Sequence, residues 1–164
     1  MSQVSFENRT VIVTGAGNGL GKAYALDLGS RGAKVVVNDL GGAVDGSGSG
    51  STPADEVVNE IIANGGEAVA NYDSVATKEG GDSIVQTAID NFGTVDAVVN
   101  NAGILRDKSF ANMSEEELSL IIDVHLKGTF FVSQPAFKVM KENAYGRIVN
   151  VASPSGLFGN FGQS

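Results

Sequence analysis

The stretch TGAGNGLG, residues 14–21, stands between the β-rich run Thr10–Thr14 and a helix-length segment. Three of its glycines, Gly15, Gly19 and Gly21, are separated by three residues and then by one. Such a loop lets the backbone approach a pyrophosphate, which the amides at the start of the following helix can bind. It predicts a dinucleotide site, although a glycine-rich turn without a ligand would have the same sequence. The residues predicted to bind the cofactor here are Gly15, Asn18, Gly19, Leu20 and Gly21.

Four further β-rich runs follow, each separated from the last by a segment long enough for a helix. The runs are continuously apolar, which is typical of strands covered by helices on both faces. This alternation predicts an α/β fold, a Rossmann-like doubly wound parallel sheet of five strands. The expected strands are Thr10–Thr14, Lys34–Asp39, Glu67–Asn71, Val95–Asn100 and Arg147–Ala152, and the expected helices are Asn18–Arg31, Thr52–Asn64, Thr77–Phe92 and Ser114–Asn143.

Local signals mark the ends of these helices. Thr52 is expected to cap the second helix, with Pro53 at its first helical position. Ser114 and Glu117 form the pattern of a capping box at the start of the last one. Pro135 lies inside that last helix and should kink or split it, because proline removes an internal hydrogen bond. Gly41–Ser51 is rich in Gly and Ser and predicts a flexible loop.

Composition narrows the classes of function. The chain has 164 residues, 42% of them apolar, and a net charge of −8. The acidic balance argues against nucleic acid or an anionic membrane as a partner. The chain has no Cys, which excludes disulfides and thiolate metal sites, and we expect no metal. No apolar run approaches the ~20 residues of a membrane span, and the N-terminus lacks a signal-peptide core, so we expect an intracellular domain.

Asp39 ends the second expected strand. An acid at this position accepts hydrogen bonds from the adenosine ribose hydroxyls of NAD and repels the 2′-phosphate of NADP. The neighbouring Asn38 and Leu40 supply no compensating cation. The sequence therefore predicts NAD as the cofactor, and the alternative is that Asp39 only caps a loop.

The run Asn100-Asn101-Ala102-Gly103, together with residues 14–21 and Asp39, resembles the short-chain dehydrogenase/reductase family. The resemblance implies that Asn101 braces the centre of the sheet and that Ala102 and Gly103 lie along the adenosine ribose. It also implies that Asp73 and Ser74 hold the adenine ring. Longer runs are similar to the branch of the family formed by the dehydrogenase units of peroxisomal multifunctional enzymes and their bacterial stand-alone relatives: VVVNDLGGAVDG (35–46), VANYDSV (69–75), NNAGILRD (100–107), DVHLKG (123–128) and SGLFGNFGQ (155–163).

This closer resemblance implies an NAD-dependent oxidation of (3R)-3-hydroxyacyl-CoA to 3-oxoacyl-CoA in β-oxidation. A 17β-hydroxysteroid dehydrogenase and a 3-oxoacyl-carrier-protein reductase are the alternative enzymes. Asp39 weighs against the reductase, which usually prefers NADPH. The resemblance also implies a homodimer, cytoplasmic if the protein is bacterial and peroxisomal if it is eukaryotic.

Enzymes of this family use a Ser, a Tyr and a Lys. Ser153 matches the Ser, with Ser155 as its rival, and a Ser-rich turn is the alternative for both. The Tyr should follow Ser153 by thirteen residues, at position 166, whereas the sequence ends at Ser164. We therefore expect residues 1–164 to form a single NAD-binding domain that is incomplete at its C-terminus. The 164-residue chain should bind NAD without activity and leave its fifth strand as an exposed sheet edge.

Two further positions carry open interpretations. His125, the only His, lies where most family members have an Asn of a proton-relay site, so it is a candidate catalytic residue. A histidine that only packs on its helix is the alternative. Arg106 and Asp107 start a loop beside the expected substrate cleft, where they contact the acyl-CoA or pair with each other. Pairing is the favoured interpretation.

Overall fold

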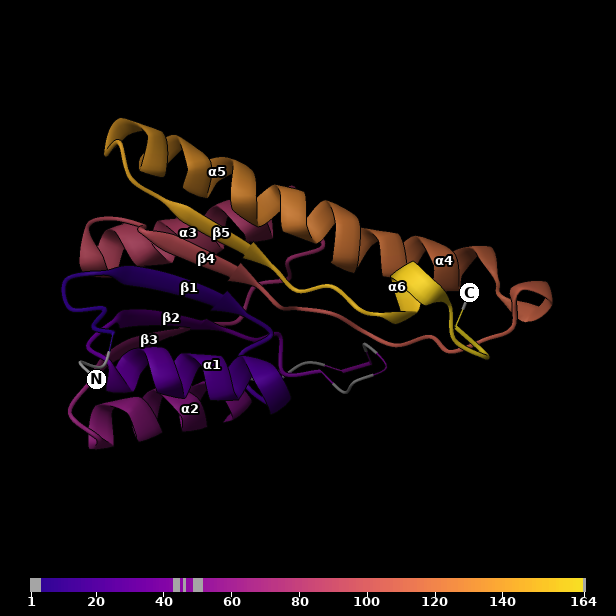
Figure 1. Ribbon diagram of the computed structural model, residues 1–164, viewed down its shortest axis with the longest axis horizontal. Coiled ribbons are helices and arrows are strands. Elements are labelled where there is room, and N and C mark those ends of the chain that lie inside the picture. The colour runs from indigo at the N-terminus through magenta and orange to yellow at the C-terminus, as the bar shows by residue number, and fades with distance from the viewer. Residues whose placement is uncertain (1–3, 43–44, 46, 49–51, 164) are drawn as a thin grey trace.

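A parallel sheet of five strands forms the centre of the computed structural model, which describes residues 4–42, 45, 47–48 and 52–163. The strand order is β3-β2-β1-β4-β5, as in a doubly wound fold (Figure 1). This confirms the predicted fold class. The strands are β1 (Thr10–Thr14), β2 (Lys34–Asn38), β3 (Glu67–Asn71), β4 (Ala97–Asn100) and β5 (Arg147–Asn150).

Helices cover both faces of the sheet (Figure 1). Alternate residues of β1 face opposite layers: Val11 and Val13 pack against the α1 and α2 side, and Ile12 packs against the α3 and α5 side. All three are at most 1% exposed, which explains why β1 is apolar at the three positions between its buried threonines, Thr10 and Thr14. The helices are α1 (Gly19–Ser30), α2 (Thr52–Ala63), α3 (Lys78–Phe92), α4 (Glu115–Ile122), α5 (Gly128–Glu142) and α6 (Ser155–Phe158), with a 3₁₀ turn η1 (Phe110–Asn112).

The expectation for residues 114–143 is wrong in two respects: the helix is interrupted well before Pro135, and it is not split at Pro135. The interruption is a π-helical turn, η2 (Asp123–Lys127), while α5 continues unbroken through Pro135. A tight contact with α3 supports α5 at this point: a Cβ on Gly81 would lie 2.5 Å from the carbonyl of Phe131, the group that Pro135 leaves without its helical donor. Burial of Val132 and Ala136 against the same layer holds the helix together where one hydrogen bond is missing.

Side chains cap two helix starts: the capping box of α4 confirms the prediction, whereas Thr77, expected inside its helix, is the cap of α3. Ser114 and Glu117 form both hydrogen bonds of the capping box, and Thr77 accepts from the Gly80 amide at the start of α3. Helix α2 begins at Thr52 itself, so Thr52 is a helical residue rather than the cap. Of the predicted flexible loop, residues 43–44, 46 and 49–51 lie outside the described part of the chain.

Strand β5 forms one edge of the sheet, as expected, and its side chains are exposed. Ile148 and Val149 are 39% and 51% exposed, in contrast to the fully buried Val98 of the neighbouring β4. Among the described residues, no helix has the length and apolar character required to cross a membrane.

Candidate cofactor site

A cavity of about 500 Å³ opens where β1, β2, β3 and β4 end. Crevices at the carboxyl ends of parallel strands are where doubly wound sheets bind their ligands. Three apolar side chains from other elements, Ile104, Leu120 and Val124, complete the wall. The wall includes every residue predicted to contact the cofactor: Gly15, Asn18, Gly19, Leu20, Gly21, Asp39, Asp73, Ser74, Asn101, Ala102 and Gly103.

The glycine loop has the backbone that its sequence predicts. Gly15 has a φ of 62°, a conformation that a residue with a side chain rarely adopts. A Cβ on Gly21 would lie 2.1 Å from the carbonyl oxygen of Gly15, so only glycine lets α1 start this close to β1. Gly19, by contrast, faces the open cavity, and a Cβ added to it would have no neighbour within 4 Å.

Asn101 fastens the glycine loop to the end of β4. Its Nδ2 donates to the carbonyl oxygens of Thr14 and Gly15, each at 3.0 Å. The Thr14 hydroxyl oxygen accepts from the amides of Asn101 and Ala102 at 3.1 and 3.0 Å. Thr14 and Asn101 therefore fix the two strand ends that flank the cavity, which is the bracing expected of Asn101.

The start of α1 points its free amides into the cavity. Asn18 is the N-cap residue, and its side chain makes no capping hydrogen bond, unlike Thr77 and Ser114 at α3 and α4. The first amides of a helix have no acceptor within the helix and lie at the positive end of its dipole. This arrangement can receive a phosphate group.

Asp39 is half-buried and has two amide donors. Its Oδ2 accepts from Gly17 and its Oδ1 from Gly41, each at 2.7 Å. The loop-capping alternative for this residue is therefore observed. It does not compete with ribose binding, because each carboxylate oxygen has a second lone pair and Asp39 also lines the cavity. No Lys or Arg occurs among the described residues of the cavity wall, so nothing there would neutralise a 2′-phosphate.

A network of buried amides supports the Asp73 side of the cavity. Asn38 donates to Asn71 Oδ1 and to the carbonyl of Asp73, each at 2.9 Å. Asn71 in turn donates to Asp73 Oδ2, which also accepts from the Ser83 hydroxyl at 2.7 Å. Asp73 is thus held in place from beneath by the ends of β2 and β3.

Sequence reasoning missed this row of amides. Asn38, Asn71, Asn100 and Asn150 each occupy the last position of a strand, and the parallel register aligns Asn38 with Asn71 and Asn100 with Asn150. The signal was visible in the sequence: two of the β-rich runs end in Asn, and Asn38 and Asn150 lie one and two residues before the ends of two others. Asn38 and Asn71 supply hydrogen bonds where β2 and β3 end beside the cavity, and Asn100 Nδ2 donates to the Ser133 hydroxyl and to Asn150 Oδ1.

The two candidate catalytic residues lie outside the cavity wall. Ser153 is exposed, and its Oγ accepts from the amide of its rival, Ser155, at 3.2 Å. His125 lies on the π-helical turn, and its Nε2 is 3.1 Å from the amide nitrogen and 2.9 Å from the carbonyl oxygen of Ile104. His125 therefore contacts the backbone of the cavity wall rather than the cavity itself.

No Tyr within residues 1–164 is followed by Lys four positions later. Tyr72 adjoins Asp73 but donates its hydroxyl to Asp55, and that hydrogen bond raises the pKa of Tyr72 above its ordinary value of 10.0. A phenol that acts as a base near neutral pH needs the opposite shift, so Tyr72 is unsuited to that role.

The favoured interpretation of Arg106 and Asp107 is wrong. They do not pair with each other: Arg106 Nη1 lies 3.7 Å from Asp45, and both carboxylate oxygens of Asp107 accept from Gln163 Nε2. Adjacent side chains in an extended segment point in opposite directions, so each finds its partner on a different neighbouring loop.

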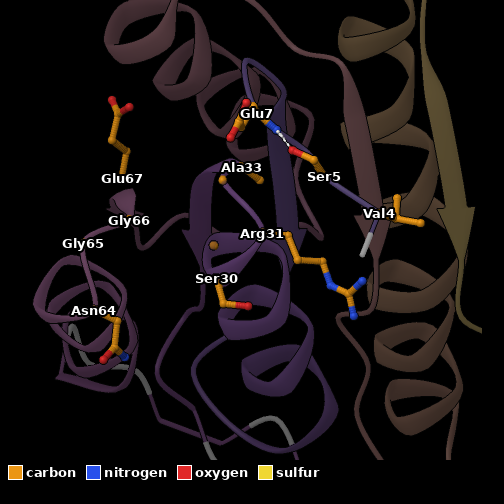
Figure 2. A pocket seen from close by; sticks show the side chains of 12 residues that line it. Val4, Ser5, Glu7, Ser30, Arg31, Ala33, Asn64, Gly65, Gly66 and Glu67 are labelled. Atoms are coloured by element: carbon orange, nitrogen blue, oxygen red, sulfur yellow. Dashed lines mark hydrogen bonds between the residues drawn. The ribbon is translucent and has the colours of Figure 1, made fainter. Parts of the chain in front are cut away.

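A second hollow, of about 370 Å³, lies near the amino ends of the strands, between the end of α1 and the turn after α2 (Figure 2). Its wall includes Ser5, Glu7, Ser30, Arg31 and Asn64, and Ser5 accepts a hydrogen bond from the amide of Glu7. None of the predicted cofactor residues lines it. The cavity beside the glycine loop is therefore the candidate site.

The sequence is similar to known enzymes over nearly its whole length. The peroxisomal hydratase-dehydrogenase-epimerase of Saccharomyces cerevisiae is 59% identical over 98% of the chain, and the peroxisomal multifunctional enzyme type 2 of Mus musculus is 56% identical over 99%. The chain spans only 18% and 22% of those two proteins. The crystal structure of a short chain dehydrogenase from Mycobacterium avium matches 96% of the chain with a TM-score of 0.87 and 47% identity, and the chain covers 56% of it.

The family model described as short chain dehydrogenase matches residues 9–164, which include the glycine loop, Asp39 and the Asn100–Gly103 motif. The chain belongs to the short-chain dehydrogenase family.

Proposed function

We propose that the chain forms the NAD-binding part of an oxidoreductase that converts (3R)-3-hydroxyacyl-CoA to 3-oxoacyl-CoA. The observation that carries the cofactor assignment is the pairing of an uncapped α1 N-terminus with the Asp39 carboxylate in one cavity. The amides of the loop and of α1 suit a pyrophosphate, and a carboxylate without a nearby cation suits a ribose with both hydroxyls free.

The residues present fit NAD. Asp39 would accept from the adenosine ribose hydroxyls, while Gly19 leaves open space for the pyrophosphate. Asp73 and Ser74 would border the adenine ring, and Ala102 and Gly103 would lie along the ribose. Bound NAD supplies the hydride acceptor of the reaction. The chain's own residues would orient it in the cavity.

The substrate assignment rests on the runs shared with the hydroxyacyl-CoA branch of the family and on the names of the yeast and mouse relatives. Ser153 would polarise the substrate oxygen from the end of β5, where it is exposed beside Ser155. A hydroxysteroid or a 3-oxoacyl group on a carrier protein are the alternative substrates. The two relatives are peroxisomal by name, and we propose the same compartment for this protein if its source is eukaryotic and the cytoplasm if it is bacterial.

The 164 residues would bind NAD without turning over substrate, because they contain no Tyr-x-x-x-Lys motif. A polypeptide extended through that motif would be active as a homodimer. We base the dimer on the family resemblance, with α4 and α5 as the contact surface.

Calorimetric titration with NAD and with NADP tests the cofactor assignment on the folded chain. We expect a saturable signal with NAD and at least about tenfold weaker binding of NADP, a difference of about 1.4 kcal/mol. Equal affinity for the two, or no binding of either, would contradict the proposal. The extended polypeptide should then reduce NAD with a (3R)-3-hydroxyacyl-CoA and leave the (3S) isomer unreacted.

A further inference from the structure

Two loops leave the carboxyl ends of the neighbouring strands β4 and β5. The loop after β4 carries Asn101 to Ile104 along the cavity wall and continues to Asp107. The segment after β5 carries Ser153, passes through α6 and returns to the first loop at Gln163 (Figure 1). Ser153, the candidate catalytic residue, thus lies on a loop that leaves the sheet and comes back to the loop after β4, a few residues beyond the part that lines the cofactor cavity.

This second loop is anchored at two places. Near its start, the amide of Val151 donates to the carbonyl of Asn100, the last residue of β4. Near its end, Gln163 pairs with Lys108 in a parallel β-bridge, and its Nε2 lies 3.1 and 3.2 Å from the two carboxylate oxygens of Asp107. Ser153 lies between the two anchors, so its position depends on both.

Gln163 is itself held in a fixed orientation. Residues 160–163 form a turn in which Gly162 has a φ of 77° and the Gln163 amide donates to the carbonyl of Asn160. Asn160 Nδ2 donates to Gln163 Oε1 at 3.1 Å, which leaves Gln163 Nε2 directed at Asp107. Both ends of the Gln163 amide are therefore used, and the donor end meets an ionised acceptor, which makes for a stronger hydrogen bond than a neutral one.

We propose that Asp107 is a positioning residue: through Gln163 it fixes the loop that carries Ser153 to the loop after β4, whose first residues line the cofactor cavity. The inference rests on the proposed function, because Ser153 matters only if hydride transfer occurs beside it. Asp107 touches neither cofactor nor substrate in this role. It sets the distance between the Ser153 hydroxyl and a substrate held over the cavity, to which reaction rates are steeply sensitive.

The first experiment needs no catalysis. The chain has no Cys, so Ser153→Cys allows a single fluorescent label at that position, whose anisotropy reports the mobility of the loop. Asp107→Ala should lower the residual anisotropy of the label. Gln163→Glu should lower the anisotropy further, because two carboxylates would then face each other. Asp107→Asn combined with Gln163→Glu should restore the anisotropy, because it exchanges the donor and the acceptor.

Asp90→Ala is the matched control. Asp90 is an exposed Asp that accepts from the side-chain amide of Gln86 at 2.7 Å within α3, away from both loops. It should leave the label unchanged. The proposal would be overturned if the anisotropy of the label were the same in Asp107→Ala as in the parent. It would also be overturned if the combined variant had no higher anisotropy than Gln163→Glu alone. Both outcomes are independent of whether the chain binds NAD.

The second experiment uses the polypeptide extended through the end of its reading frame. Asp107→Ala should lower kcat about tenfold or more while the Kd for NAD stays unchanged, and the combined variant should recover most of the loss. Unchanged kcat in Asp107→Ala would overturn the positioning role. Absence of turnover in the unsubstituted extended polypeptide would instead overturn the proposed function.

Discussion

Asp39 Oδ2 accepts a 2.7 Å hydrogen bond from the amide of Gly17, so the acid that follows β2 also holds the glycine loop that leaves β1. The contact is tight: a Cβ on Gly17 would lie 2.8 Å from that same carboxylate oxygen. Since Oδ1 accepts from Gly41, one side chain ties together the loops that follow two strands. The proposed selection of NAD and the order of the glycine loop therefore depend on the same carboxylate.

Replacing Asp39 should affect stability and cofactor choice together. Asp39→Ala removes the acceptor of two amides and should lower the free energy of unfolding by about 1–2 kcal/mol, measured by urea denaturation. It should also weaken NAD binding and narrow the preference over NADP. Asp39→Asn keeps one oxygen acceptor and should retain more of the stability. A fully stable Asp39→Ala chain would show that the amide contacts contribute nothing.

Gly19 and Gly21 should respond differently to the same substitution. Gly21→Ala places a methyl group against the Gly15 carbonyl and Asn101 Nδ2, so we expect a loss of about 1–3 kcal/mol or more in unfolding free energy. Gly19→Ala meets no neighbour, but Gly19 has a φ of 54°, so a cost of about 1 kcal/mol should come from the backbone. In Gly19→Ala the added methyl group faces the cavity, and NAD affinity should fall at least about tenfold. Equal effects of the two substitutions on stability would contradict this assignment of roles.

The sheet and the cofactor wall were predictable because their signals are local. The interior positions of the buried strands are apolar in succession, and the glycine loop tolerates no side chain at Gly15 and Gly21, so both constraints are visible in short runs of sequence. The interruption at residues 123–127 was not predictable in this way. It depends on how Val124 faces the cavity while His125 reaches Ile104, and neither contact is visible from helical periodicity.

The partners of the charged loop residues could not be predicted from the sequence either. Arg106 and Asp107 are adjacent and opposite in charge, which favours pairing on local grounds alone. Gln163 is brought near by the order of the strands, because it lies on the segment after β5, the neighbour of β4, whereas Asp45 lies on the loop after β2, two strands away. Surface ion pairs contribute little to stability, so the fold determines which charged side chains meet, and their pairing does not determine the fold.

His125 should act through the backbone of Ile104. Its Nε2 lies within reach of both the amide and the carbonyl of Ile104, but one nitrogen serves only one of them at a time. His125→Ala should therefore cost about 1 kcal/mol of stability and weaken NAD binding, since Ile104 lines the cavity. His125→Asn, which supplies a donor and an acceptor, should retain more of both.

Leu126→Ala provides the control for His125, because Leu126 lies on the same π-helical turn and is 60% exposed. It should change neither stability nor NAD affinity appreciably. If His125→Ala left both unchanged and reduced only the turnover of an extended polypeptide, a proton-relay role would replace the positioning role.

The capping box of α4 should make stability depend on pH in the acid range. The amide of Ser114 donates to the Glu117 carboxylate, and together with the nearby Lys108 it holds the pKa of Glu117 below its ordinary value of 4.5. A carboxyl whose pKa is lower in the folded state contributes stability above the unfolded pKa, and this contribution is lost as the pH falls through the folded value. Glu117→Gln should therefore reduce the unfolding free energy above pH 4.5 and have little effect at the acid end, where the parent's carboxyl is itself protonated. Urea denaturation across this range measures the difference.

Glu115→Gln is the control for Glu117→Gln. It removes a charge from the same first turn without touching the capping box, and it should flatten the pH dependence of stability less. Parallel stability curves for Glu117→Gln and the parent would show that Ser114 does not stabilise the ionised carboxylate.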